Sequence, residues 1–261
     1  MPTCEPFDAE KIIALWTELL TLQIDLGYYP DEGAISFPPP EGRPIDEAIC
    51  REFDLTSEVI TLIKRLPCPS TFDGAWDTPI FNESVAVSFA DNTMIRGSRD
   101  LDNRWIGPGE YVRPDYMNPE DLTLVMERDE SGYHLILDTK ANTVRFYEAM
   151  MAPYCSWEED QYQPERPDDR MHYRNYPARP ALEVLEELVA KFRNLDWIPM
   201  NYEGTWPAIV VEYYDEDEQF PNARTNARNI LRSQFGWPDN FDKERWILQR
   251  KNIWKQVLNR R

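Results

Sequence analysis

The stretch that decides the fold is Tyr133-His134-Leu135-Ile136-Leu137-Asp138, followed closely by Thr143-Val144-Arg145-Phe146-Tyr147. Both runs contain β-branched and aromatic residues, which favour extended strands. Between them, Lys140-Ala141-Asn142 can form a turn, because asparagine tolerates a positive φ. The two runs therefore predict an antiparallel hairpin that belongs to a sheet of three or more strands.

Further strands are predicted from short apolar runs elsewhere in the chain. Ser84–Phe89 alternates as a half-buried strand does, and Leu122–Met126 is a second candidate. Ile209–Val211 is a third, much shorter run. We therefore place the sheet within residues 71–150.

Helices are predicted on the N-terminal side of this sheet. Apolar residues recur at helical spacing from Asp8, a candidate N-cap, to Leu26, and Gly27 follows as a candidate C-cap. A short helix is predicted over Ile45–Phe53. Another begins at Thr56 or Ser57 and is ended by Pro67.

The C-terminal half begins with a Pro-rich, charged segment, residues 151–180, whose lack of periodicity predicts a long loop. A helix is predicted from Pro180 to about Asn194. A second runs from Pro221 to Phe235 and is closed by Gly236, and a final helix is capped by Asp239 or Asn240.

These elements predict an α+β fold with a helical N-terminal part, a central antiparallel sheet with a hairpin, and C-terminal helices. At 261 residues the chain is one large domain or two small ones. We interpret residues 1–261 as a single domain with a helical part (1–70), a sheet (71–150), a long loop (151–180) and a helical C-terminal part (181–261).

The composition indicates a soluble, cytoplasmic chain. The sequence has four cysteines without a CxxC pair, no N-terminal signal pattern and no apolar run long enough to span a membrane. The net charge of −19 disfavours contact with DNA or an anionic membrane. We therefore expect reduced thiols and neither a membrane nor DNA as a partner.

The charge is distributed unevenly along the chain. Residues 221–261 carry ten Lys and Arg against three acids, or +7, which leaves −26 on residues 1–220. The basic side chains that could contact RNA phosphates are Arg224, Arg228, Arg232, Arg250, Lys251 and Lys255. The first three are spaced by four residues and share one helical face. The alternative is a charge-balanced surface in which Arg224 and Arg228 pair with nearby acids.

An acidic run precedes the basic segment and contains the candidate site residues Asp215, Asp217 and Glu218. Carboxylates can bind a hard cation or clamp a guanidinium or ammonium group. The run can also be a solvated turn that favours the N-terminus of the next helix.

Signatures of common enzymes are absent from the sequence. It contains no HExxH, GxSxG, GxxxxGK[ST] or GxGxxG pattern. Of the two histidines, we interpret His134 as a hydrogen-bonded sheet residue and His172 as a solvated loop residue. The sequence therefore predicts neither a metal site nor a cofactor.

Several short motifs are similar to a family of fungal arginine-containing cyclodipeptide synthases. They are Phe37–Pro40, Val59–Pro67, Leu135–Thr139, Leu195–Pro199 and Phe235–Pro238 with Phe241. The resemblance implies an enzyme of secondary metabolism, an aminoacyl transferase or ligase. It would join residues from aminoacyl-tRNAs, including arginyl-tRNA, into a cyclic dipeptide.

The resemblance also implies which residues act. The family's DDxxE motif falls on residues 214–218, where Asp215 and Glu218 match its second and last acids and Tyr214 departs from the first. The implied catalytic residues are Asp215 and Glu218, with Asp217, and the basic side chains given above would hold tRNA. Tyr214 leaves open whether such a site is active.

Two other functions remain open. Helices followed by a hairpin, with the stretch Gly132–Asp138, resemble the SMI1/KNR4-like scaffold domain, which is a non-catalytic interaction protein. A scaffold would not need a phosphate-facing basic helix, so the basic segment distinguishes the two resemblances. A metal-dependent enzyme using the acidic run would instead be stabilised by a divalent ion.

Overall fold

The computed structural model describes residues 6–29, 33–71, 78–81, 83–99, 101, 116–128, 132–148, 165–166, 168–169, 171–201, 208–210 and 222–258. The predicted hairpin is present. Strand β5 (His134–Asp138) pairs antiparallel with β6 (Thr143–Tyr147), with His134 opposite Tyr147 and Asp138 opposite Thr143. In the turn between them, Asn142 takes a φ of 52°, as its residue type allows.

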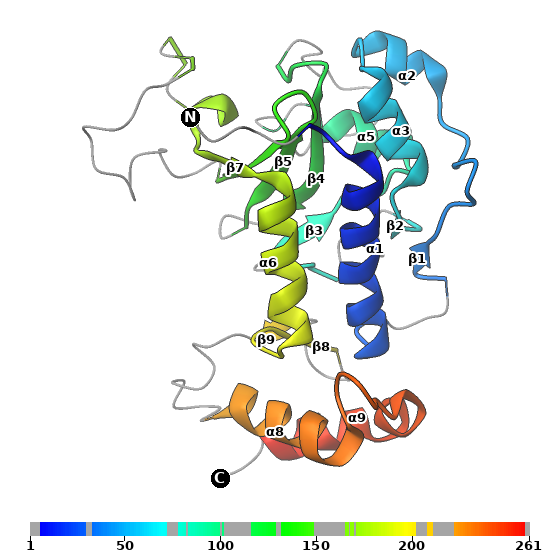
Figure 1. Cartoon of the computed structure of the whole chain (residues 1–261), viewed down its shortest axis with the longest axis vertical. Helices are drawn as coiled ribbons and strands as arrows, with labels where there is room; N and C mark the ends of the chain where they lie inside the picture. The colour runs from blue at the N-terminus through cyan, green and yellow to red at the C-terminus, as the bar shows by residue number, and fades with distance from the viewer. Residues whose placement is uncertain are drawn as a thin grey trace.

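The hairpin lies inside a five-stranded antiparallel sheet of order β3-β4-β5-β6-β7 (Figure 1). Strand β4 (Asp121–Glu127) pairs with β5, and the shorter β3 (Ser84–Ala86) pairs with β4. Helices lie at both ends of the chain, which confirms the predicted α+β class.

The segment predicted as a loop over residues 151–180 contains regular structure near its end. A short 3₁₀ helix, η3 (Tyr173–Asn175), is followed by β7 (Ala178–Pro180), which pairs with β6. Elements of three residues are too short to show periodicity, and β7 is held by pairing with a distant strand rather than by its own composition.

Two long helices pack side by side against the sheet (Figure 1). The first, α1 (Ala9–Asp25), is capped by the Asp8 side chain and followed by Gly27, as predicted. The second, α6 (Ala181–Arg193), directly follows β7. Their buried apolar residues share one core with β4, β5 and β6.

The other N-terminal elements are short. The predicted helices are found as α2 (Glu47–Glu52) and α3 (Ser57–Arg65). A two-stranded sheet of β1 (Ile35–Ser36) and β2 (Cys68–Pro69) and the helix α5 (Asn92–Gly97) were not predicted.

The C-terminal part has a core of its own beneath α1 and α6 (Figure 1). It is formed by β8 (Ile198–Met200), β9 (Ala208–Val210), α8 (Ala223–Phe235) and α9 (Lys243–Leu258). Trp246, which is fully buried in this core, donates its indole N–H to the carbonyl of Leu26 at 2.8 Å. The C-terminal core is thereby attached to the end of α1.

The start of α9 differs from the prediction. Asp242, rather than Asp239 or Asn240, accepts the N–H of Arg245 at 3.1 Å. Asn240 instead closes a turn, donating its N–H to the carbonyl of Gly236 at 2.9 Å. Gly236 has a φ of 74°, and a Cβ there would lie 2.4 Å from the Asn240 carbonyl oxygen, so the turn requires glycine.

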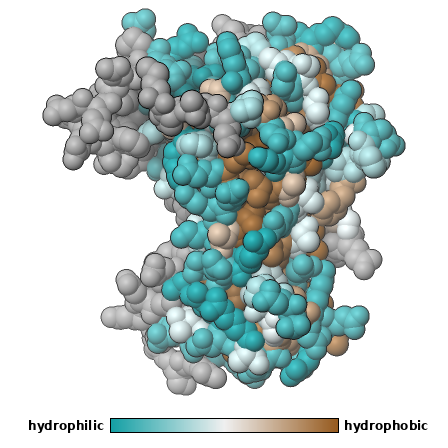
Figure 2. Space-filling view, viewed as in Figure 1, coloured by the Kyte–Doolittle hydropathy of each residue, from teal (hydrophilic) through white to brown (hydrophobic). Residues whose placement is uncertain are grey.

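Among the described helices, none has the length and apolar character needed to cross a membrane. Figure 2 shows a largely hydrophilic face with an apolar strip where α1 and α6 meet.

Candidate functional site

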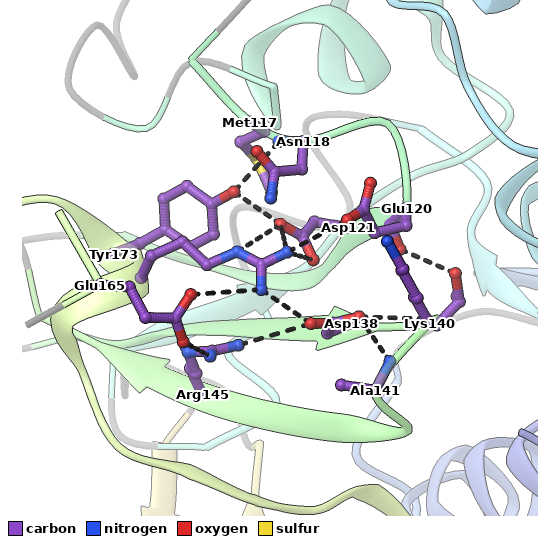
Figure 3. A network of polar contacts seen from close by, with 12 residues as sticks. Met117, Asn118, Glu120, Asp121, Asp138, Lys140, Ala141, Arg145, Glu165 and Tyr173 are labelled. Atoms are coloured by element: carbon purple, nitrogen blue, oxygen red, sulfur yellow. Dashed lines mark hydrogen bonds and ion pairs between the residues drawn. The ribbon is translucent and has the colours of Figure 1, made fainter. Parts of the chain in front are cut away.

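Arg174, in η3, contacts the carboxylates of both Asp121 and Asp138 and is the centre of a buried network of charged side chains. Figure 3 shows these two carboxylates and Tyr173 within the network. The Arg174 guanidinium contacts both carboxylate oxygens of Asp121, with Nη2 2.8 Å from Oδ1 and Nε 3.0 Å from Oδ2. Its Nη1 lies 2.8 Å from Oδ2 of Asp138. Asp121 and Asp138 are register partners at the ends of β4 and β5, so the network closes one end of the sheet.

Further donors surround Asp121. The Tyr173 hydroxyl donates to Asp121 Oδ2 at 2.6 Å, and buried Arg99 donates to the Asp121 carbonyl oxygen. Burial raises the pKa of the Asp121 carboxyl from an ordinary 3.8 to about 6, although Arg174 and Tyr173 oppose this shift. Burial lowers the pKa of Arg99 to about 10, which leaves it charged at neutral pH.

Asp138 connects the network to the hairpin turn. Its Oδ1 accepts the N–H groups of Lys140 at 3.0 Å and Ala141 at 2.8 Å, while its Oδ2 faces Arg174. Arg145, on β6, lies 3.8 Å from the same Oδ2. One carboxylate therefore fixes both the network and the turn that carries Lys140.

A pocket of about 590 Å³ lies beside this network. It is bounded by the N-terminal ends of α1 and α3 and by the hairpin turn. Lining side chains include Phe7, Ser57, Glu58, Thr61, Glu120 and Lys140. Glu120 belongs to both features, because its Oε1 lies 3.7 Å from Nη2 of Arg174 (Figure 3).

Hydrogen bonds fasten the walls of the pocket to one another. The Thr56 N–H donates to the carbonyl of Pro119 at 3.2 Å, which joins α3 to the segment before β4. Thr139 donates to the Glu120 carbonyl from its N–H at 3.0 Å and from its hydroxyl at 2.8 Å. The pocket is therefore built on a fixed frame and is suited to binding.

The three predicted catalytic acids, Asp215, Asp217 and Glu218, lie outside the described residues. Within the part of the chain that is described, His, Cys, Asp and Glu side chains form no group of three or more that could hold a metal ion.

The predicted RNA-binding arginines of α8 face the protein's own oxygen atoms. Arg224 and Arg228 lie 3.9 and 3.5 Å from the Asp196 carboxylate. Arg232 donates to the carbonyl of Asn194 at 3.0 Å, at the C-terminal end of α6. This face of α8 therefore corresponds to the charge-balanced alternative.

The predicted cations of α9 divide into two kinds. Arg250 is half-buried and donates to the carbonyl of Asn201 at 3.4 Å, and burial lowers its pKa. Lys251 and Lys255 are exposed. The structure therefore does not gather all six predicted side chains into one exposed face.

The two histidines are both buried. His134 lies in β5, as predicted, with Nε2 3.7 Å from the Glu127 carboxylate. The prediction that His172 is solvated is wrong, because its Nδ1 accepts the N–H of Arg174 at 3.1 Å and its ring stacks on Tyr173.

Sequence reasoning missed the network itself. Asp121 and Asp138 flank apolar strand residues, and acids in such positions are a signal for buried pairing that was available in the sequence. Arg174 gave no signal, because it lies in a charged segment without periodicity. Its role follows only from the fold.

Comparison of this chain with protein-family models, curated proteins and solved structures gives no match.

Proposed function

We propose that this protein acts as a non-catalytic interaction protein, in the manner that its resemblance to SMI1/KNR4-like scaffold domains implies. The observation that carries this proposal is the placement of the α8 arginines. Arg224 and Arg228 face Asp196, and Arg232 holds the Asn194 carbonyl. This placement matters because the resemblance to cyclodipeptide synthases requires α8 to face RNA, whereas the scaffold resemblance does not.

The energetics of phosphate binding explain why this placement matters. A side chain binds RNA phosphate by exchanging counterions, which requires an exposed, unpaired cation. An arginine already paired with a carboxylate must break that contact first, and the remaining carboxylate then repels the phosphate. The α8 face is consequently better suited to holding α6 and α8 together.

The order of the elements also agrees with the scaffold resemblance. The helices α1, α2 and α3 precede the hairpin of β5 and β6 in the chain, with β2, β3, α5 and β4 between them.

A tRNA-dependent synthase is the second candidate, favoured by the exposed Lys251 and Lys255 on α9. In this proposal Asp215, Glu218 and Asp217 would act on arginyl-tRNA and a second aminoacyl-tRNA to give an arginine-containing cyclic dipeptide. A cytoplasmic location, where tRNA is present and thiols stay reduced, suits both candidates.

One expression experiment separates these functions. The chain is produced in a bacterial host fed isotopically labelled arginine, and extracts are searched by mass spectrometry for labelled cyclic dipeptides. The purified protein is titrated with tRNA at about 50 and 200 mM salt, where phosphate binding falls steeply. We expect no labelled product and no salt-sensitive tRNA binding.

A positive arm uses cells that naturally produce the protein. Tagged protein is cross-linked, treated with ribonuclease and purified, and a recovered partner is then tested for direct binding with both components pure. Direct binding would support the interaction function. A labelled dipeptide that disappears in the Glu218→Gln variant would overturn it in favour of the synthase.

A further inference from the structure

Three hydroxyl groups around the pocket described above, those of Ser57, Thr61 and Thr139, already donate their protons to oxygen atoms of the protein. Thr61 donates to the carbonyl of Ser57 at 2.8 Å, and the Ser57 hydroxyl donates to Glu58 Oε2 at 3.0 Å. The Thr139 hydroxyl donates to the Glu120 carbonyl at 2.8 Å. These hydroxyls therefore offer lone pairs to a ligand, which makes the pocket rich in acceptors.

The backbone N–H groups at the N-terminal ends of α1 and α3, beside the pocket, also have hydrogen-bond partners within the protein. Free N–H groups at helix N-termini attract anions, but here Asp8 Oδ1 accepts the N–H groups of Glu10 at 3.1 Å and Lys11 at 3.2 Å. In α3, the Thr56 hydroxyl accepts the N–H of Val59 at 3.4 Å. Both helices are capped by the protein's own oxygen atoms, so an anion gains little here.

Two carboxylates, Glu58 and Glu120, line the same space, together with the ammonium group of Lys140. The backbone N–H of Glu58 and the hydroxyls of Ser57 and Thr56 lower the pKa of Glu58, which keeps it ionised. The Glu120 side chain is 21% exposed and shares Arg174 with Asp121 and Asp138. The chain's net charge of −19 adds a long-range attraction for cations.

We propose that this pocket binds a lysine or arginine side chain of a partner protein, with Glu58 and Glu120 pairing its charged end. Phe7 and Ala9 supply apolar surface for the methylene groups of that side chain. Lys140 can meet a carbonyl oxygen of the partner's backbone. The identification of the occupant as a partner chain rests on the proposed interaction function, whereas recognition of the cation does not.

Amide chemical shifts of the full chain test this proposal. The protein is titrated with the capped tripeptides Gly-Arg-Gly and Gly-Lys-Gly and with the neutral Gly-Gln-Gly. We expect the cationic peptides, and not the neutral one, to shift the amides of Thr56–Thr61 and Thr139–Lys140. Glu58→Gln should weaken their binding about two- to fivefold, the range of an exposed ion pair.

Glu47→Gln is the matched control, because Glu47 is likewise an exposed acid in the first turn of a short helix but does not line the pocket. We expect unchanged peptide binding in this variant. Equal weakening in both variants would show a general charge effect and overturn the site. Pocket shifts caused by inorganic phosphate instead of the cationic peptides would also overturn it.

Methylguanidinium and butylammonium distinguish the source of the cation. If they bind as tightly as the peptides, the occupant is a free small cation and the partner-chain part of the proposal is wrong. If a captured partner binds Glu58→Gln as well as the original protein, the interaction function stands and this pocket is not its site.

Discussion

At the scale of single residues, the surroundings of the Asp121 carboxyl have opposing effects on its pKa. It is fully buried, which disfavours its charge, and it contacts the Arg174 guanidinium and the Tyr173 hydroxyl, which favour it. Burial has the larger effect and raises its pKa to about 6. The folded protein therefore holds a proton that the unfolded chain has already released between about pH 4 and 6.

This difference gives a pH dependence with a definite sign. Because the folded pKa is the higher one, the contribution of Asp121 to stability is full below about pH 4 and is lost as the pH rises to about 6. The loss is on the order of 2–3 kcal/mol, at about 1.4 kcal/mol per pKa unit. Urea unfolding at intervals between pH 4 and 7 measures it.

Asp121→Asn supplies the comparison, because an amide does not titrate in this range. The stability difference between the two proteins should change across pH 4–6 and stay constant above it. Glu10, Glu58 and Glu187, whose pKa values are lowered, act in the opposite sense but equally in both proteins. Parallel stability curves would contradict the prediction.

The roles of individual residues were harder to predict from the sequence than the helices and strands. The sequence predicts a loop around His172 and Arg174, yet both side chains are buried, and His172 Nδ1 accepts the backbone N–H of Arg174. Their positions depend on β4 and β5, which lie far away in the chain. Residue type and local spacing carry no information about such a partner.

At the scale of elements, the close packing of the segment before β5 against the residue before β3 and the end of β4 depends on Gly132. A Cβ at this position would lie 2.3 Å from the carbonyl oxygen of Glu83 and 2.8 Å from Cβ of Glu127. Gly132→Ala should therefore force the strands apart and destabilise the protein by about 1–3 kcal/mol, which a urea unfolding curve would show.

Gly97→Ala is the control for this change. Gly97 lies in α5, and a Cβ there has no other atom within 4 Å. Alanine should be neutral at this position or stabilising by up to about 1 kcal/mol, because it favours helices. If Gly132→Ala behaved like Gly97→Ala, the strands would be shown to have room to adjust.

Elements were predictable where their signals were local. α1 and α3 each carry an apolar pattern, a cap and a terminating residue within one stretch, and the hairpin carries two strand patterns around a turn. All three are found. β1, β2 and β7 are two or three residues long, and each pairs with a strand that lies far away in the chain. The pairing of Arg224 and Arg228 with Asp196 was not predictable for the same reason, since Asp196 lies outside α8, in the segment that follows α6.

At the scale of the whole molecule, two apolar cores meet at the C-terminal ends of α1 and α6 (Figure 1). Trp246 belongs to the C-terminal core and bonds to Leu26 at the end of α1. Trp246→Phe removes this hydrogen bond and leaves a void, so it should destabilise the protein by about 1–3 kcal/mol. Hydrogen exchange should show the loss of protection mainly in residues 222–258.

Leu248→Ala is the control in the same helix, because Leu248 is 82% exposed. Its effect on stability should stay within about 0.5 kcal/mol. A loss of protection spread evenly over the central sheet in Trp246→Phe would contradict the expected independence of the C-terminal core.

The bond between Trp246 and Leu26 also sets an order of events during synthesis. The two residues are 220 positions apart, and a ribosome adds about 5–20 residues each second. After its synthesis, the Leu26 carbonyl therefore has no Trp246 indole to accept from for on the order of 10–40 s. Throughout that interval the end of α1 lacks its contact with α9, so we expect this end of the nascent helix to stay open to other contacts until α9 has been made.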